Sequence, residues 1–194
     1  METLLSIAIG IGLAAACGFR VFVPLLILNL AVLSGQINLP AGFAWIGSIS
    51  ATVAFATATV VEILGYYIPW FDHALDTVAT PAAVVAGTLT TAVFITDVSP
   101  FLKWTMALIA GGGIAGLVQA STVVLRAKSS LATAGAGNPI FSTFELAGAT
   151  LTGLLAVFVP ILSLMLIAIF CFWALRKIMK LLWRKLKGAK DPQA

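Results

Sequence analysis

Apolar positions run through this chain in long segments, and short polar stretches separate them. The first segment covers residues 3–33, and as one helix it would reach about 45 Å. That exceeds the ~30 Å hydrocarbon core of a bilayer. Because Gly18 and Pro24 flank Arg20 inside this segment, we expect a kink or a break into two shorter helices.

The remaining apolar segments predict transmembrane helices over residues 43–66, 82–95 and 101–125, and two more within 141–182, with Pro160 near their junction. A span needs about 20 mostly apolar residues. The sequence therefore predicts an all-α integral membrane protein with about six transmembrane helices and a kinked or broken first helix. We expect one transmembrane domain over 1–185 and a basic cytoplasmic tail over 186–194.

Composition supports a membrane environment. Of the 194 residues, 61% are hydrophobic and 9% are charged, whereas soluble domains carry about 25% charged residues. Few residues remain outside the spans. Binding or catalysis is therefore expected within the helix bundle or in its short loops.

Basic residues gather at the C-terminus. Lys and Arg favour the cytoplasmic side and are attracted to anionic lipid heads, so this tail predicts topology and does not indicate nucleic acid as a partner. With six spans, both termini are expected in the cytoplasm and the loop around Asn38 outside, in a multipass protein of the inner (plasma) membrane. The basic residues concerned are Arg176, Lys177, Lys180, Arg184, Lys185, Lys187 and Lys190.

A weak internal similarity suggests a repeat. "GLAAAC" at 12–17 and "GLVQAS" at 116–121 are each followed by a span that opens with Phe, "FAWIGSISAT" and "FSTFELAGAT". Three spans per half would invert the second copy, as in many secondary transporters. Two inverted three-helix repeats, 1–98 and 101–185, are one interpretation, and chance similarity between Gly/Ala-rich helices is the other.

Three charges fall inside the predicted spans. Arg20 lies in the first apolar segment, Glu62 about one turn before the end of the second span, and Glu145 about one turn into the fifth. A charge at mid-membrane costs about 2.5–3.5 kcal/mol and is usually paired or lines a wet cavity. We therefore expect Arg20 to be neutralised inside the bundle, with Glu62 the preferred partner and Glu145 the second choice.

The acids and Arg20 predict a polar pocket that opens toward the cytoplasm. Glu62 and Glu145 approach that face, and the stretch between the second and third spans adds further acids there. The alternative is that these acids are interfacial, solvated, or paired with Arg126 and Lys128. The candidate substrate-binding residues are Arg20, Glu62, Asp72, Asp76, Asn138 and Glu145.

Neither a cofactor nor a metal is expected. His73 is the only histidine, and Cys17 and Cys171 lie in apolar segments without metal-ligand spacing. The chain also offers no recognisable nucleophile beside a base. We therefore do not expect an enzyme.

Several motifs resemble the bacterial membrane family called domain of unknown function 4126. They are "AAACGFRVFVPLL", "VEILGYYIPWFDHALDTVATPAA", "GLVQASTVVLRA", "NP" and "FELAG", and they cover about residues 10–176. The family's pattern has Gly-hydrophobic-Arg followed by Pro, then a Glu, Pro, Asp series, then Asn-Pro and an acid. The matching positions are Gly18, Arg20, Pro24, Glu62, Pro69, Asp72, Asn138, Pro139 and Glu145.

This resemblance implies the fold and the polar positions, and it implies no activity. The family often has an Asp-Lys pair where this chain has Gly65 and Tyr66, so an ion pair at that place is not expected to be essential.

The first functional hypothesis is a small transporter- or channel-like protein with a polar intramembrane site around Arg20. A guanidinium grips carboxylate or phosphate with two hydrogen bonds, which suits a small anionic solute or a lipid head group. If Glu62 or Glu145 neutralises Arg20, the site could instead serve cations or protons. The alternatives are a non-transporting scaffold or assembly factor and an intramembrane lipid enzyme. The expected partners are the lipid bilayer and this solute or head group, and a homo-oligomer stays open.

Overall fold

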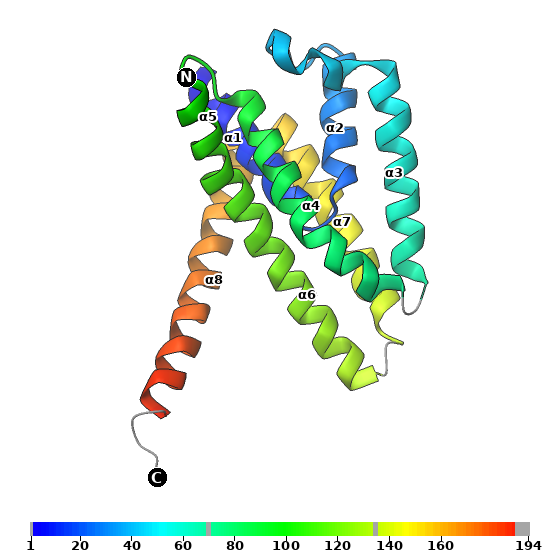
Figure 1. The fold of residues 1–194 in the computed structure, drawn as a ribbon, viewed down its shortest axis with the longest axis vertical. Coiled ribbons are helices and arrows are strands. Elements are labelled where there is room, and N and C mark those ends of the chain that lie inside the picture. The colour runs from blue at the N-terminus through cyan, green and yellow to red at the C-terminus, as the bar shows by residue number, and fades with distance from the viewer. Residues whose placement is uncertain (1, 69–70, 134–135, 189–194) are drawn as a thin grey trace.

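The computed structural model describes residues 2–68, 71–133 and 136–188, and within these ranges it is a bundle of helices without strands (Figure 1). The all-α class is confirmed. The elements are α1 (Glu2–Cys17), α2 (Phe22–Leu33), the 3-10 helix η1 (Ala41–Gly47), α3 (Ile49–Tyr67), α4 (Phe71–Phe94), α5 (Pro100–Met106), the π-helical η2 (Ala107–Gly112), α6 (Gly113–Thr133), α7 (Asn138–Phe158) and α8 (Pro160–Gly188).

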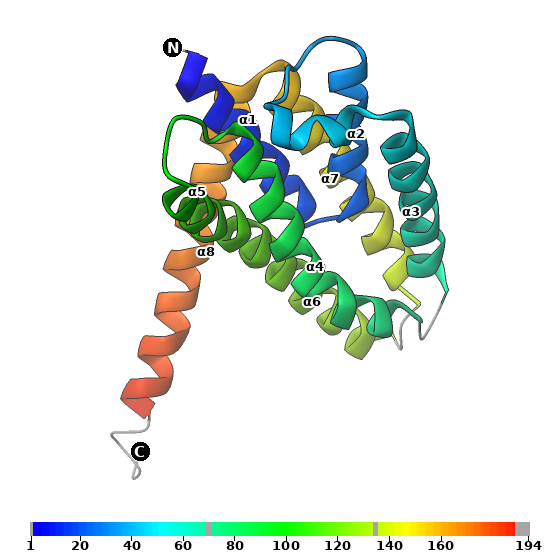
Figure 2. The ribbon, with the colours of Figure 1, turned by 45° about the horizontal axis from the view of Figure 1, so that its top comes forward.

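The first apolar segment breaks at Arg20, as predicted, and its two halves run in different directions. α1 runs into the bundle from one end, and α2 returns toward that same end (Figures 1 and 2). With 16 and 12 residues, they measure about 24 and 18 Å, less than a ~30 Å core. The segment therefore forms a helical hairpin inside the bundle.

Five helices in the described part of the chain are long and apolar enough to cross a membrane: Ile49–Tyr67, Ala74–Phe94, Pro100–Thr133, Asn138–Phe158 and Pro160–Lys180. The count differs slightly from the expected six because the first apolar segment forms two shorter apolar helices, α1 and α2. α1 consequently begins at one end of the bundle and α8 ends at the other (Figure 1). The expectation that both termini face the cytoplasm rested on an even number of spans, and it stays a prediction.

Two predicted boundaries also move. Residues 41–47 form η1 instead of opening the second span, and α3 begins after Ser48, whose hydroxyl accepts the backbone N–H of Ala51 (3.1 Å). α4 begins at Phe71, so Asp76 lies on a helix and not in a loop. The predicted junction near Pro160 is confirmed, since α7 ends at Phe158 and α8 starts at Pro160.

Small residues let the helices approach closely around α1. Residues 12–18 of this helix and its end are all buried, and α1 contacts α2, α4, α6, α7 and α8. A Cβ on Gly18 would come within 2.5 Å of the Ala115 carbonyl oxygen. In lipid there is no hydrophobic driving force between helices, so the van der Waals contacts of closely packed small side chains stabilise the bundle instead.

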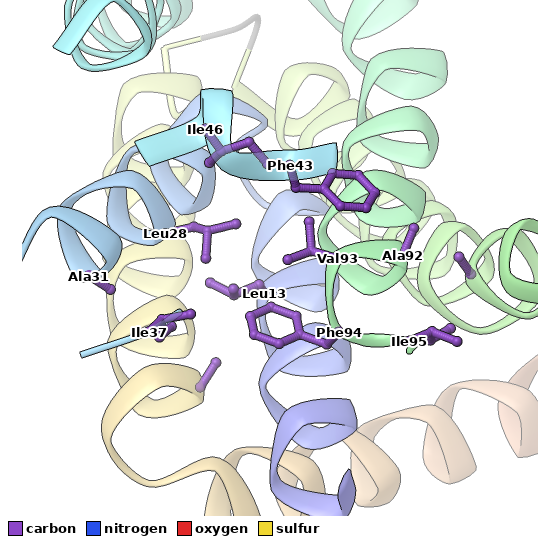
Figure 3. Close-up of a cluster of buried hydrophobic side chains, with 12 residues drawn as sticks. Leu13, Leu28, Ala31, Ile37, Phe43, Ile46, Ala92, Val93, Phe94 and Ile95 are labelled. Carbon is purple, nitrogen blue, oxygen red and sulfur yellow. The ribbon is translucent and has the colours of Figure 1, made fainter. Parts of the chain in front are cut away.

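An apolar cluster closes the end of the bundle where α1 begins. Leu13 of α1, Leu28 of α2, Phe43 of η1 and Phe94 of α4 converge there, with Val93 beside them (Figure 3). The other end of α1 lies among polar side chains. α1 therefore connects an apolar layer of the bundle to a polar one.

The predicted inverted repeat is not shown by this arrangement. The matched segments of α3 and α7 run in opposite directions, whereas those of α1 and α6 run in the same direction (Figures 1 and 2). The reversal between α1 and α2 causes this difference.

Candidate functional site

Arg20 lies in the break between α1 and α2, and its side chain is 1% exposed. Its Nη2 donates to the Ser142 carbonyl oxygen (3.1 Å) and to Ser142 Oγ (2.5 Å), and lies 3.6 Å from Glu145 Oε2. Nε and Nη1 have no hydrogen-bond partner among the described residues. Three of the five guanidinium N–H donors are therefore buried and unmatched there.

Glu62 does not form the ion pair with Arg20 that was preferred from sequence. Its two carboxylate oxygens instead accept the backbone N–H groups of Val21 (2.8 Å) and Phe22 (3.1 Å). These amides open α2 and have no partner within the helix. Glu62 thus caps α2 from α3, where the positive end of the helix dipole favours an anion.

Glu145, the second choice, is shared between two arginines. Arg20 lies 3.6 Å from it, and Arg126 Nη2 donates to the same Oε2 atom. Arg126 also donates through Nη1 to Asp76 Oδ1 (2.7 Å). Arg126 is therefore held by two carboxylates, while Arg20 shares one of them at longer range.

Tyr66 contacts both arginines and Asp76. The Cζ atoms of Arg20 and Arg126 lie 3.8 and 4.3 Å from its ring centroid, within the ~6 Å range of cation–π attraction. Its hydroxyl donates to Asp76 Oδ1 (3.2 Å). The Tyr66 ring therefore attracts both guanidinium groups through cation–π contacts, and it neutralises neither charge.

The polar cluster, defined as Arg20, Glu62, Tyr66, Asp76, Arg126, Ser142 and Glu145, joins the α1–α2 connection to α3, α4, α6 and α7. The direction in which α1 runs explains how residues so distant in sequence come into contact. α1 enters from the end opposite to that where α3 ends and α7 begins (Figure 2). Its ~24 Å length therefore carries Arg20 to the depth of Glu62 and Glu145.

Two other sequence candidates have different positions. Asn138 Nδ2 donates to Ser130 Oγ (2.9 Å) and so ties the start of α7 to the last turns of α6. Asp72 begins α4, but its side chain and that of His73 lie outside the described residues. Of the six candidates, the structure gathers Arg20, Glu62, Asp76 and Glu145.

Sequence reasoning did not assign Tyr66 and Ser142 to the site, and it treated Arg126 only as a partner that would neutralise acids. The alternative prediction that Arg126 pairs with the acids is correct for Asp76 and Glu145. A periodic signal was present: polar residues recur on one buried face of α6 and of α7 at helical spacing. They are Gln119, Thr122, Arg126 and Ser129 on α6, and Asn138, Ser142 and Glu145 on α7.

A groove of about 580 Å³ leads from the outer surface of the bundle, between α3 and α4, to Glu62 and Tyr66. Its walls are mostly apolar, for example Val53, Val61 and Val78. These three valines are exposed on the outer surface of α3 and α4. The groove is therefore suited to an apolar chain or to an amphiphile approaching from the bilayer.

Within the described residues, no three His, Cys, Asp or Glu side chains gather in the way a metal site requires. The cluster holds its carboxylates against arginines and backbone N–H groups. Its chemistry is that of charge pairing and hydrogen bonding.

Fold and site together define a small all-α membrane protein with a buried ionic cluster at the break of its first apolar segment. The chain belongs to the family described as domain of unknown function (DUF4126), whose model matches residues 7–180. The resemblance noted in the sequence is thereby confirmed. No curated protein and no solved structure matches the chain.

Proposed function

We propose that this protein is a transporter- or channel-like membrane protein that binds an anionic group at Arg20. The observation that carries the proposal is the set of three buried N–H donors on Arg20 without a described partner. A carboxylate or phosphate oxygen is a strong, charge-assisted acceptor for such N–H donors. Either a small solute or a lipid head group supplies that chemistry.

The cluster holds three carboxylates and two guanidinium groups, and of the two arginines Arg20 is the less completely neutralised. Asp76 and Glu145 both accept from Arg126, and the α2 amides hold Glu62. Arg20 has only the 3.6 Å contact with Glu145. A further anion would therefore gain most next to Arg20.

The broken helix supports transport over a purely structural role. In many secondary transporters, substrate and ion sites are built at discontinuous helices near the membrane midplane. Here the break, the capped start of α2 and Arg20 coincide. We further propose an inner-membrane protein with its basic C-terminal tail in the cytoplasm, which would leave α1 beginning on the outer side.

Two assays on reconstituted protein test this function and separate the two sources of the anionic group. Uptake of inorganic phosphate or acetate into proteoliposomes probes a solute. Transbilayer movement of fluorescent phosphatidylglycerol probes a lipid head group. We expect activity in one of them, a loss of at least tenfold in Arg20→Ala, and a partial loss in Arg20→Lys, which keeps the charge but not the fork.

Lys103→Ala, outside the cluster, is the matched control and should keep full activity. Activity that survives Arg20→Ala would overturn the proposal. The scaffold alternative predicts no Arg20-dependent movement in either assay and no water path to Arg20. Labelling of Arg20→Cys by a small water-soluble thiol reagent measures that path.

A further inference from the structure

A second groove lies between α6 and α8, away from the polar cluster, with a volume of about 310 Å³. Leu117, Val124 and Leu125 of α6 form one wall, and Phe170 and Trp173 of α8 form the other. Lys128 and Lys177 also line it. No acidic side chain is among its lining residues.

The two lysines lie toward one end of this groove. Lys128 is near the end of α6, which stops at Thr133, and Lys177 is near the end of the apolar part of α8, which stops at Lys180. Both helices run toward the same end of the bundle, the end opposite to the start of α1 (Figure 1). The groove is therefore apolar along its length and cationic at the proposed cytoplasmic surface.

Aromatic and basic neighbours match a membrane interface. Lys177 Nζ lies 4.7 Å from the Trp173 ring centroid. Trp is enriched at the head-group level of bilayers, and basic pockets between transmembrane helices on the cytoplasmic side bind anionic head groups. Lys177 is thus held where a lipid phosphate would be.

We propose that the α6–α8 groove is a binding site for an anionic phospholipid, with an acyl chain between the helices and the phosphate between Lys128 and Lys177. The complementarity is twofold: apolar walls face the chain, and two cations with no lining acid face the phosphate. This site is separate from the one at Arg20. Each lysine contributes about fivefold to binding near the surface, or about 25-fold together.

Native mass spectrometry of the full chain in mild detergent tests this site. The probes are phosphatidylglycerol and phosphatidylcholine with identical acyl chains. We expect preferential retention of phosphatidylglycerol, a loss of roughly 10- to 25-fold in Lys128→Gln/Lys177→Gln, and retention in the corresponding double Arg variant. Lys103→Gln removes a lysine at the opposite end of the bundle and should change nothing.

The apolar half of the site is tested by Ala120→Trp, which fills the groove from an exposed position and leaves both lysines in place. We expect it to weaken retention of phosphatidylglycerol as well. Equal retention of the two lipids, or unchanged retention in the double Gln variant, would overturn the proposal. A lipid-free dimer that Ala120→Trp dissociates would also overturn it and would assign the groove to a second copy of the chain.

Discussion

At the scale of single residues, the two buried arginines differ in how completely they are satisfied. Arg126 donates to Asp76 and Glu145, whereas Arg20 bonds Ser142 and reaches Glu145 only at 3.6 Å. Breaking a buried ion pair leaves an uncompensated charge, which costs more than the pair contributes. We therefore expect Arg126 to contribute more to stability than Arg20, and the proposed anion to bind at Arg20.

Arg126→Ala is expected to lower the free energy of unfolding by about 3–5 kcal/mol, because Asp76 and Glu145 lose their charge-assisted donor. Arg20→Ala should cost less, since Glu145 keeps Arg126. Thermal unfolding of both variants in the same detergent checks this order. Equal destabilisation by the two substitutions would contradict the difference in their roles.

Glu62 is expected to hold the start of α2. Glu62→Gln keeps one acceptor oxygen but places an N–H₂ group against the second backbone amide and removes the charge at the helix N-terminus. Such interactions are worth about 0.3–2 kcal/mol. Hydrogen exchange of the segment containing Val21 and Phe22 should become faster.

Asp97→Asn is the matched control for Glu62→Gln, because Asp97 is an exposed acid in a loop and Asn tolerates its positive φ of 59°. Unchanged exchange at the start of α2 in Glu62→Gln would show that the carboxylate does not hold this helix end.

At the scale of elements, the π-helical segment η2 lets α4 approach the long helix Pro100–Thr133. Gly87 of α4 faces Gly111 of η2, and a Cβ on Gly111 would overlap the Gly87 carbonyl oxygen and the Thr91 hydroxyl. Gly113, two residues further on, has nothing within 4 Å of the same position. Within the triple glycine, a glycine is therefore needed for close packing at position 111 and is not needed at position 113.

Gly111→Ala is expected to destabilise the protein by about 1–3 kcal/mol, the usual cost of overpacking, because the backbone at Gly87 must move as well as the Thr91 side chain. Gly113→Ala should be neutral or slightly stabilising, since Ala favours the helix by up to about 1 kcal/mol. Melting temperatures of the purified variants compare them directly. A destabilised Gly113→Ala beside an unaffected Gly111→Ala would refute the close approach.

At the scale of the whole molecule, the helical hairpin of α1 and α2 sets the end of the bundle from which each later helix starts. Five long helices follow it, so α1 begins and α8 ends at opposite ends (Figure 1). The α2–η1 connection lies at the end where α1 begins, and the connection after α6 lies at the other end. Accessibility from the two sides of the membrane therefore distinguishes this topology from six spans.

With Cys17 and Cys171 replaced by Ser, a cysteine at Asn38 is expected to react with a membrane-impermeant maleimide from outside. A cysteine at Ala136 should react only after permeabilisation, because the basic C-terminal helix favours the cytoplasm. A cysteine at Glu2 should behave like the one at Asn38. If it behaved like the one at Ala136, α1 would start on the cytoplasmic side, as six spans require.

Local sequence was sufficient for the class of the protein and for the place where the first segment breaks. Apolar runs longer than a bilayer is thick predict membrane helices, and Gly18 and Pro24 around Arg20 predict the interruption. The cost of burying a charge in lipid indicated that Arg20, Glu62 and Glu145 need partners. Glu145 is a partner of Arg20, whereas Glu62 caps α2 instead of pairing with Arg20. These signals act within a few helical turns, so they can be detected along the chain.

Tertiary structure alone decided which groups are paired and which way α2 runs. Either direction of α2 buries the same apolar residues, so the hydrophobic pattern does not distinguish them. Glu62, some 40 positions away, stabilises the start of α2 inside the bundle, and Arg126 takes up Asp76 and Glu145 from two further helices. The partner of each buried charge depends on which helices meet at one depth, and that depends on long-range packing.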